Sequence, residues 1–256
     1  MQQTRGLFDG VGVALVTLFD HDGDVDAKAT SEHAARLADQ GVRGIVVAGS
    51  TGEAAMLDPE ERSQLVRAVR AAVPTDVAVL AGTGAPSTRQ AVALTRRAAD
   101  DGADAALVLS PPGARDPRPY YEQVAAAVDI AVLAYHFPKV SDPGIPVDTV
   151  RELPVAGMKD STGDPARLAV EIEQLPHGMY VGSPALIFQA QAMGCRGAIL
   201  ALANVDPEGC RRAWDGDGAA QRTLLTGHRA GALTGIAGLK HALCELYGTS
   251  PTTRIG

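Results

Sequence analysis

The chain has 256 residues, of which 46% are hydrophobic and 21% charged, as expected for a globular protein with a substantial core. Its formal net charge of −7 argues against binding to nucleic acid or to an anionic membrane, because both require a basic surface. No apolar run reaches the length that crosses a bilayer, so we expect a cytoplasmic protein. The three cysteines fit neither a zinc nor a redox spacing, which favours buried, reduced thiols.

Short apolar segments alternate with amphipathic ones along the chain. The apolar segments show no polar alternation, which is typical of strands in a parallel sheet covered by helices on both faces. They lie at residues 12–18, 44–48, 77–81, 105–109, 131–135, 155–158, 179–182 and 197–200. Helical periodicity appears between them, for example at residues 27–40, 60–72 and 87–101.

Eight strands, each followed by a helix, predict a (β/α)8 barrel, or TIM barrel, over residues 1–206. Helical patterns at 207–215, 218–229 and 234–247 predict a short C-terminal helical appendage, within residues 207–256, that packs on the barrel. A doubly wound open sheet is the alternative architecture. It would need a glycine-rich nucleotide-binding turn after an early strand, and Gly82-Thr83-Gly84 is only a fragment of one.

In a (β/α)8 barrel, the loops at the C-terminal ends of the strands carry the active site. One lysine, Lys159, is predicted there, after the apolar residues 154–158 and before a polar loop that contains glycine. An amine held by apolar neighbours is desolvated, which favours the neutral nucleophile over the ammonium ion. A lysine in an exposed loop is the alternative interpretation.

Two further groups of polar residues fall at strand ends. Gly49-Ser50-Thr51-Gly52-Glu53 offers hydroxyl and amide donors that a carboxylate can approach closely, although a plain turn is the alternative. Tyr135 could simply pack in the core with its hydroxyl bonded. A tyrosine, a lysine and a hydroxyl loop that converge on one face of a barrel favour a catalytic site over separate structural roles.

These motifs resemble those of the dihydrodipicolinate synthase and N-acetylneuraminate lyase family, the class I pyruvate-type aldolases, almost from end to end. Residues 12–17 with Phe19 resemble the family's first strand. Residues 49–53 match its GxxGE carboxylate loop, and Tyr135 with Pro138 matches its catalytic tyrosine motif. Residues 157–161, Gly-Met-Lys-Asp-Ser, match its Schiff-base lysine motif.

The resemblance implies that Lys159 adds to the keto carbon of pyruvate or another 2-keto acid and forms an iminium ion. Tyr135 would carry protons to and from the substrate oxygen, assisted by Ser50 or Thr51. The substrate-binding residues implied are Gly49, Ser50, Thr51, Gly52, His136, Ser183 and Ile199. Schiff-base chemistry requires no cofactor and no metal. The expected partners are therefore pyruvate, as the small-molecule 2-keto acid, and an aldehyde.

Two positions depart from the synthases of that family. Ser110-Pro111-Pro112-Gly113 stands where synthases carry a tyrosine pair, one member of which joins the proton relay of the neighbouring subunit. Val140 stands where they carry an arginine for the carboxylate of the aldehyde, and the adjacent Lys139 lacks the fork of an arginine. We therefore expect a Schiff-base lyase or aldolase that cleaves or condenses pyruvate, or a sugar-derived 2-keto acid, with an aldehyde.

Two alternative functions remain. One is the 4-hydroxy-tetrahydrodipicolinate synthase reaction of lysine biosynthesis, and the other is a non-catalytic family member that binds a keto acid. The resemblance also implies a homo-oligomer, either a dimer or a homotetramer. The C-terminal helices are shorter than is typical of the family.

Overall fold

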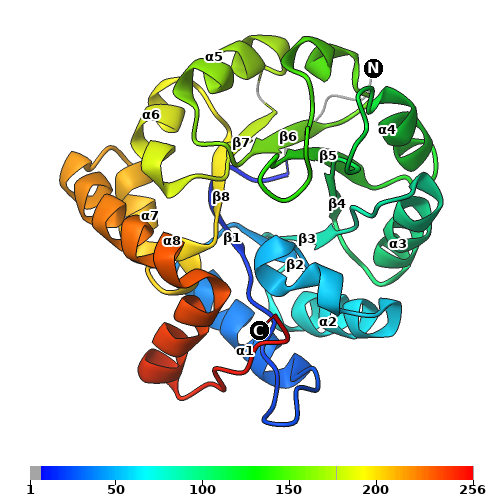
Figure 1. The fold of residues 1–256 in the computed structure, drawn as a ribbon. Helices are drawn as coiled ribbons and strands as arrows, with labels where there is room; N and C mark the ends of the chain where they lie inside the picture. The colour runs from blue at the N-terminus through cyan, green and yellow to red at the C-terminus, as the bar shows by residue number, and fades with distance from the viewer. Residues whose placement is uncertain (1–6, 177, 256) are drawn as a thin grey trace.

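The structure, a computed structural model, describes residues 7–176 and 178–255, without the side chains of 228–234. Within this range eight parallel strands follow one another around a closed barrel, and β1 pairs with β8 to complete the ring (Figure 1). The predicted (β/α)8 barrel is confirmed. The strands are β1 (Gly10–Ala14), β2 (Gly44–Val47), β3 (Ala78–Gly82), β4 (Ala105–Leu109), β5 (Ala131–His136), β6 (Gly157–Asp160), β7 (Met179–Val181) and β8 (Gly197–Leu200).

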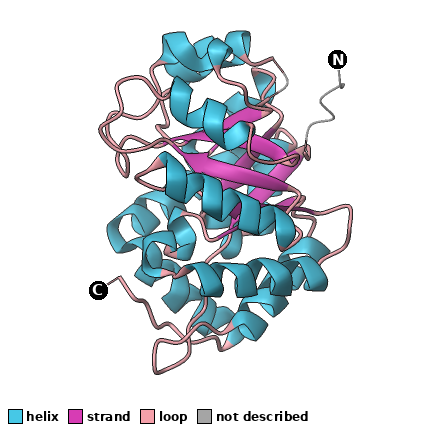
Figure 2. Cartoon of the chain, turned by 90° about the vertical axis from the view of Figure 1, so that its right-hand side faces the viewer, coloured by secondary structure: helices cyan, strands magenta, loops and turns pink. Residues whose placement is uncertain are grey.

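Helices surround the strands, which lie in the centre of the molecule (Figure 2). The α-helices of the described residues are α1 (Ala27–Asp39), α2 (Pro59–Ala72), α3 (Thr88–Asp100), α4 (Arg118–Ala125), α5 (Pro165–Gln174), α6 (Ile187–Ala192), α7 (Pro207–Trp214) and α8 (Gly218–Tyr247). Gly235, with φ 57° and ψ −145°, kinks α8. The non-helical backbone of Gly235 divides α8 into two helical parts, in agreement with the two helices predicted at 218–229 and 234–247.

Side-chain caps fix where the loops after β2 and β6 end. The Asp58 carboxylate accepts the Glu61 amide, and the Glu61 carboxylate accepts the Asp58 amide, which is a capping box at the start of α2. The Asp164 carboxylate accepts two amides at the start of α5, where Pro165 is the first helical residue. α2 begins one residue before the helix predicted at 60–72.

The first strand is shifted from its predicted position at 12–18. β1 begins at Gly10, which pairs with Gly197 of β8. The Leu15 amide still donates to the Val46 carbonyl at 3.0 Å, and beyond it the backbone bonds to side chains. The Val16 amide donates to Asn204 Oδ1, and the Leu18 amide to Thr30 Oγ1.

The connection from β5 to β6 lacks the expected α-helix. It contains a 3₁₀ segment, Val147–Glu152, in its place. Pro138, Pro143 and Pro146 occupy this connection, and proline lacks the amide hydrogen that a helix interior needs. The 3₁₀ segment still packs into the core, with Val150 and Leu153 buried.

The barrel interior is closed at its N-terminal end by Phe8. The inward side chains form a separate small core, which comprises Phe8, Ala14, Val46, Ala78, Leu80, Ala105, Leu107, Leu133, Tyr135, Tyr180 and Ile199. The Tyr180 hydroxyl donates to the Phe8 carbonyl at 2.9 Å. A Cβ atom would come within 2.7 Å of the Phe8 ring on Gly12 and within 2.3 Å on Gly44. Both positions therefore require a residue without a side chain.

The division into a barrel of residues 1–206 and C-terminal helices of 207–256 stays a prediction. α7 contacts α6 and β1 as well as α8, so it packs closely on the barrel. Among the described residues, no helix combines the length and the apolar character needed to span a membrane.

We expect Phe8→Ala to lower the free energy of unfolding by about 3–5 kcal/mol, because it empties the closed end of the barrel. Phe188→Ala is the matched control, since Phe188 is 37% exposed and Phe8 is 6% exposed. Denaturant unfolding of both variants checks the prediction. Equal losses in the two variants would contradict the role of Phe8 as a plug.

Candidate active site

Lys159 and Tyr135 lie side by side inside the mouth of the barrel. They occupy paired positions of β6 and β5, and both point inward because their neighbours Met158 and Ala134 point into the outer core. Lys159 is 4% exposed and Tyr135 is 5% exposed. The Lys159 Nζ atom lies 4.5 Å from the centroid of the Tyr135 ring. The strand thus extends through Lys159, which the sequence placed just beyond it.

Ser161 and Gly182 complete the surroundings of Lys159. The Ser161 hydroxyl donates to the Tyr135 hydroxyl oxygen at 3.4 Å. A Cβ atom on Gly182 would come within 2.9 Å of Lys159 Cε and 2.0 Å of Ser161 Oγ. Neither residue was among the predicted site residues. Gly182 directly follows β7 in the structure, and a glycine at that end of a strand is the signal that could have identified it.

The predicted hydroxyl loop follows β2 and turns as a short 3₁₀ segment, Ser50–Gly52. The amides of Gly52 and Ala54 donate to the Gly49 carbonyl at 3.0 and 3.2 Å. From β1's side of the barrel, the Thr17 hydroxyl donates to the Gly52 carbonyl at 2.8 Å. These bonds hold Ser50 and Thr51 at the mouth in one arrangement.

The residues that flank this loop have left-handed backbones. Ala48 has φ 52° and Glu53 has φ 55°. Each costs roughly 1–3 kcal/mol for a residue other than glycine and persists only when its surroundings enforce it. Such strain concentrates at functional sites, which fits a loop built for binding.

A cavity of about 960 Å³ opens at this loop. Its lining includes Ser50, Thr51 and Phe137, and the Phe137 ring stacks on the Tyr135 ring with their centroids 5.9 Å apart. The remaining lining is mainly apolar and includes Leu57, Ala85, Leu109, Val140, Ile236 and Ile255. The cavity therefore continues from the hydroxyl loop along an apolar wall.

Two arginines line the cavity, and other groups hold both. Arg62 donates to the carbonyls of Gly82 and Ala54. Arg97 pairs with Glu60 at 2.8 Å and donates to Ser63 at 2.6 Å. Neither guanidinium group can bind an acidic ligand unless it gives up these bonds.

Ile199 and Ser183 lie at the ends of the last two strands. Ile199 is fully buried on β8 inside the barrel, in register with Gly12. Ser183 follows β7, and its hydroxyl accepts the Ala185 amide at 3.3 Å as the cap of a short turn. A Cβ atom on Gly163, in the loop after β6, would contact it at 3.1 Å. Ser183 thus lies beside the loop that follows the lysine.

His136 has the surroundings of a structural residue. It follows the inward Tyr135 on β5, and its Nδ1 accepts the Ile145 amide at 2.8 Å. Its Nε2 faces the Asp160 carboxylate at 4.0 Å, and both side chains are buried. The expected contact of His136 with substrate therefore has no support from this geometry, because alternation along β5 turns the ring away from the barrel interior.

His136 belongs to a buried cluster with Asp160, Arg167 and Glu171 on the outer side of β6. The Arg167 Nε lies 3.2 Å from Asp160 and 2.6 Å from Glu171. Burial, followed by the Asp160 charge, raises the pKa of Glu171 to about 8. Burial, followed by the Arg167 charge, lowers the pKa of His136 to about 4. The cluster holds β6 against α5 and so supports the strand that carries Lys159.

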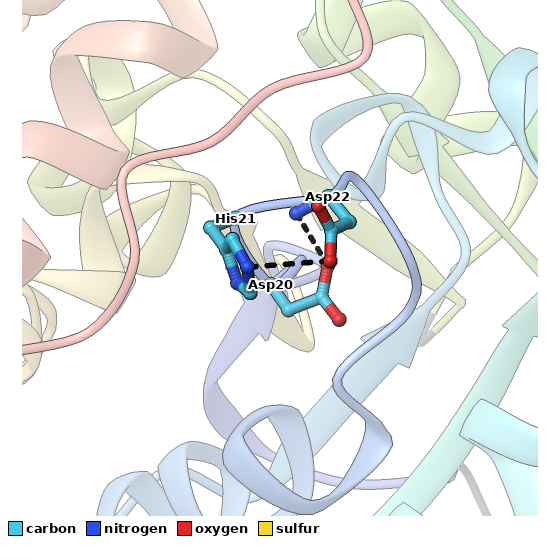
Figure 3. A group of neighbouring side chains, drawn as sticks. All are labelled: Asp20, His21 and Asp22. Atoms are coloured by element: carbon cyan, nitrogen blue, oxygen red, sulfur yellow. Dashed lines mark hydrogen bonds and ion pairs between the residues drawn. The ribbon is translucent and has the colours of Figure 1, made fainter.

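One group of the described residues could bring three metal-ligating atoms together, although metal ligands were not expected. Figure 3 shows Asp20, His21 and Asp22 on the hairpin-like turn before α1. The Asp20 carboxylate already accepts the amides of Asp22 and Asp24 at 2.9 Å each, and His21 pairs with Asp22. His21 and Asp22 are exposed, which is typical of a solvated turn. We assign no metal to it.

A sequence profile of the Dihydrodipicolinate synthetase family matches residues 7–226. The chain belongs to this family. An uncharacterized DapA-like lyase of Halobacterium salinarum is 39% identical over 209 residues, which cover 78% of this chain and 68% of the relative. The 4-hydroxy-tetrahydrodipicolinate synthase of Pseudomonas aeruginosa is 36% identical over 229 residues, 84% of this chain and 78% of that enzyme.

Among solved structures, the chain is similar to YagE, a prophage protein of E. coli K12 from the dihydrodipicolinic acid synthase family, in complex with pyruvate. The TM-score is 0.90 at 28% identity, over 97% of this chain and 92% of YagE. Membership of the dihydrodipicolinate synthetase family makes this protein an enzyme of the lyase class.

Gly182→Ala is expected to slow the reaction of Lys159 with pyruvate at least about tenfold, since the added methyl group displaces Lys159 Cε and Ser161 Oγ. The variant is compared with Gly227→Ala, where a Cβ atom meets nothing within 4 Å. The rate of borohydride trapping, measured by intact mass, gives the result. An unchanged rate in Gly182→Ala would show that the glycine does not shape the lysine site.

The buried His136 predicts a loss of stability in mild acid. Its folded pKa of about 4 lies below the value of 6.5 for an exposed histidine, so the unfolded chain binds the proton first. Stability is retained above pH 6.5 and falls as the pH drops toward 4, by roughly 2–3 kcal/mol from this residue. Denaturant midpoints at several pH values should show a shallower decline in His136→Gln. Parallel declines in the variant and the wild type would rule out this origin.

Proposed function

We propose that this dihydrodipicolinate synthetase family member is a Schiff-base lyase that condenses pyruvate with an aldehyde or cleaves the corresponding 4-hydroxy-2-keto acid. The observation that carries the proposal is the enclosed amine of Lys159 beside the ring of Tyr135. A lysine with only a structural role does not require a buried position beside a tyrosine ring. The pyruvate bound in the similar YagE structure supports the choice of keto acid.

In the first step, the neutral Lys159 amine adds to the keto carbon and forms a carbinolamine. The hydroxyl group of the carbinolamine then takes up a proton and leaves as water, which gives the iminium ion. Tyr135 is placed to supply and recover the proton, with Ser161 bonded to its hydroxyl at 3.4 Å. We propose that Ser50 or Thr51 assists from the loop after β2.

In the second step, the iminium ion acts as an electron sink. Loss of a proton from the neighbouring carbon gives an enamine, whose carbon attacks the aldehyde while the aldehyde oxygen takes up a proton. Water then hydrolyses the new iminium ion, which frees Lys159 and releases the product. Cleavage is the same sequence in reverse, and no oxidant or reductant is consumed.

The keto-acid carboxylate is assigned to the loop Gly49–Gly52. Its two hydroxyls and amides are donors, and its bonds to Thr17 and Gly49 keep them in place before the substrate arrives. Ile199 is proposed as an apolar wall inside the barrel, and Ser183 as a polar residue at its mouth. His136 is left out because its ring nitrogens face Ile145 and Asp160.

The cavity supports an aldehyde other than an acidic one. Val140 is 55% exposed at the position where synthases carry an arginine, and Arg62 and Arg97 are held by other groups. Neither of these two guanidinium groups offers a fork to a second carboxylate without giving up its present bonds. This favours a lyase of wider family type over the synthase reaction, although several relatives carry the synthase name.

Borohydride trapping with pyruvate tests the proposal. We expect a reduced pyruvyl adduct on Lys159 by peptide mass spectrometry, absent in Lys159→Arg and retained in the control Lys139→Arg. Absence of an adduct in the folded wild type would refute the mechanism. An adduct with no turnover of charged or uncharged aldehydes would instead favour the non-catalytic keto-acid-binding alternative. The dimer or tetramer and the cytoplasmic location stay predictions.

Tyr135→Phe should reduce the turnover rate on the order of 10²–10⁴-fold, because it removes the proton carrier and keeps the ring. Tyr121→Phe is the control, since the Tyr121 hydroxyl is also buried but donates to the Val108 carbonyl at 2.9 Å outside the site. Steady-state rates with pyruvate and the best aldehyde provide the comparison. A similar small loss in both variants would exclude Tyr135 as the acid and base.

A further inference from the structure

The hydroxyl loop is tied to the far end of the chain by a buried ion pair. Glu53, the last residue of the loop, has its Oε1 atom 2.6 Å from the Nζ atom of Lys240 in α8. Both side chains are fully buried. Removing two charges from water is costly, so the pair persists only because each charge is neutralised and further bonded.

Those further bonds come from the segment after α8. The amides of Arg254 and Ile255 donate to Glu53 Oε2 at 2.8 and 2.9 Å, and Lys240 also donates to the Thr252 carbonyl at 2.8 Å. The Glu53 carboxylate thus receives three donors from residues about 187 to 202 positions away in sequence. Figure 1 shows this last segment, in red, beside the elements coloured blue and cyan.

The Arg254 side chain bonds to residues that follow the hydroxyl loop and to the turn before α1. It pairs with Glu61 of α2 at 2.6 Å and donates to the carbonyls of Met56 and Gly23. The Phe19 ring lies between the two cations, with Lys240 Nζ at 4.1 Å and Arg254 Cζ at 4.6 Å from its centroid.

A backbone hydrogen bond connects Glu53 to Ser50, one of the two residues that carry the hydroxyls. The Glu53 amide donates to the Ser50 carbonyl at 3.2 Å, and its φ of 55° is the strained value that the anchored side chain enforces. Release of the carboxylate would allow Glu53 to relax toward an ordinary backbone conformation. Because Ser50 and Thr51 form the turn that ends at Glu53, their hydroxyls would move with it.

We propose that Lys240 and the segment Thr252–Ile255 are positioning residues, which form a C-terminal lock that holds the hydroxyl loop in the shape that binds the keto-acid carboxylate. Ile255, which ends the lock, lines the same cavity as Ser50 and Thr51. The inference rests on the proposed function for its ligand. It adds that affinity for the keto acid is set by residues that do not touch the carboxylate.

The test compares Lys240→Met and Arg254→Ala with the wild type and with Arg212→Ala, which breaks a surface ion pair to Asp217 away from the loop. Arg254→Ala keeps the Glu53–Lys240 pair, so it is the variant that tests the proposal if Lys240→Met does not fold. Circular dichroism identifies a temperature at which every variant is folded, and all trapping reactions are run at that temperature. The readout is the pyruvate concentration that gives half-maximal borohydride trapping on Lys159, followed by the adduct yield at saturating pyruvate.

We expect the half-saturating pyruvate concentration to rise about tenfold or more in Lys240→Met and about threefold in Arg254→Ala, with nearly full yield at saturation. Arg212→Ala should match the wild type. Lower unfolding temperatures with wild-type half-saturation in both lock variants would overturn the proposal, because the contacts would then serve stability alone.

Failure of the proposed function would be recognised separately, by a wild type that forms no adduct. The lock is then judged by hydrogen exchange of the amides of residues 50–56, which needs no substrate. Faster exchange there in Lys240→Met and Arg254→Ala, but not in Arg212→Ala, supports the lock. Unchanged exchange in both lock variants refutes it.

Discussion

Alternation of side chains along closed parallel strands is the constraint on which the site depends. All eight described strands run in one direction, so every C-terminal end opens at the same mouth. Adjacent residues of a strand point to opposite layers, which sends Lys159 and Tyr135 inward and Asp160 and His136 outward. The inner pair faces the barrel interior, while the outer pair joins a buried network with Arg167 that braces β6. A shift of one residue in β6 would exchange these roles.

Space at the mouth is created by residues without side chains. Gly182 leaves room for Lys159 and Ser161, and a Cβ atom on Gly82 would come within 2.2 Å of the Ala48 carbonyl. The same principle operates at the closed end, where Gly44 accommodates the Phe8 ring. One end of the barrel is therefore filled by an aromatic ring, and near the other end a bare glycine makes room for a buried amine.

The sequence predicted the barrel and the inward lysine and tyrosine, because both follow from local apolar patterns and from motifs of a few residues. It missed the anchoring of Glu53, whose partners lie near residues 240–255 and leave no periodic trace. It also left the orientation of His136 open, because a strand's last residue could continue the alternation or belong to the loop.

The long separation between Glu53 and Arg254, 201 positions, has a consequence for the order in which the molecule is made. During synthesis the strands can pair as they emerge from the ribosome, and the hydroxyl loop appears in the first quarter of the chain. The carboxylate that ends this loop receives its donors only after residues 240–255 have been synthesised. The nascent chain can thus pair all eight strands, the last of which ends at Leu200, before the donors that anchor its hydroxyl loop exist.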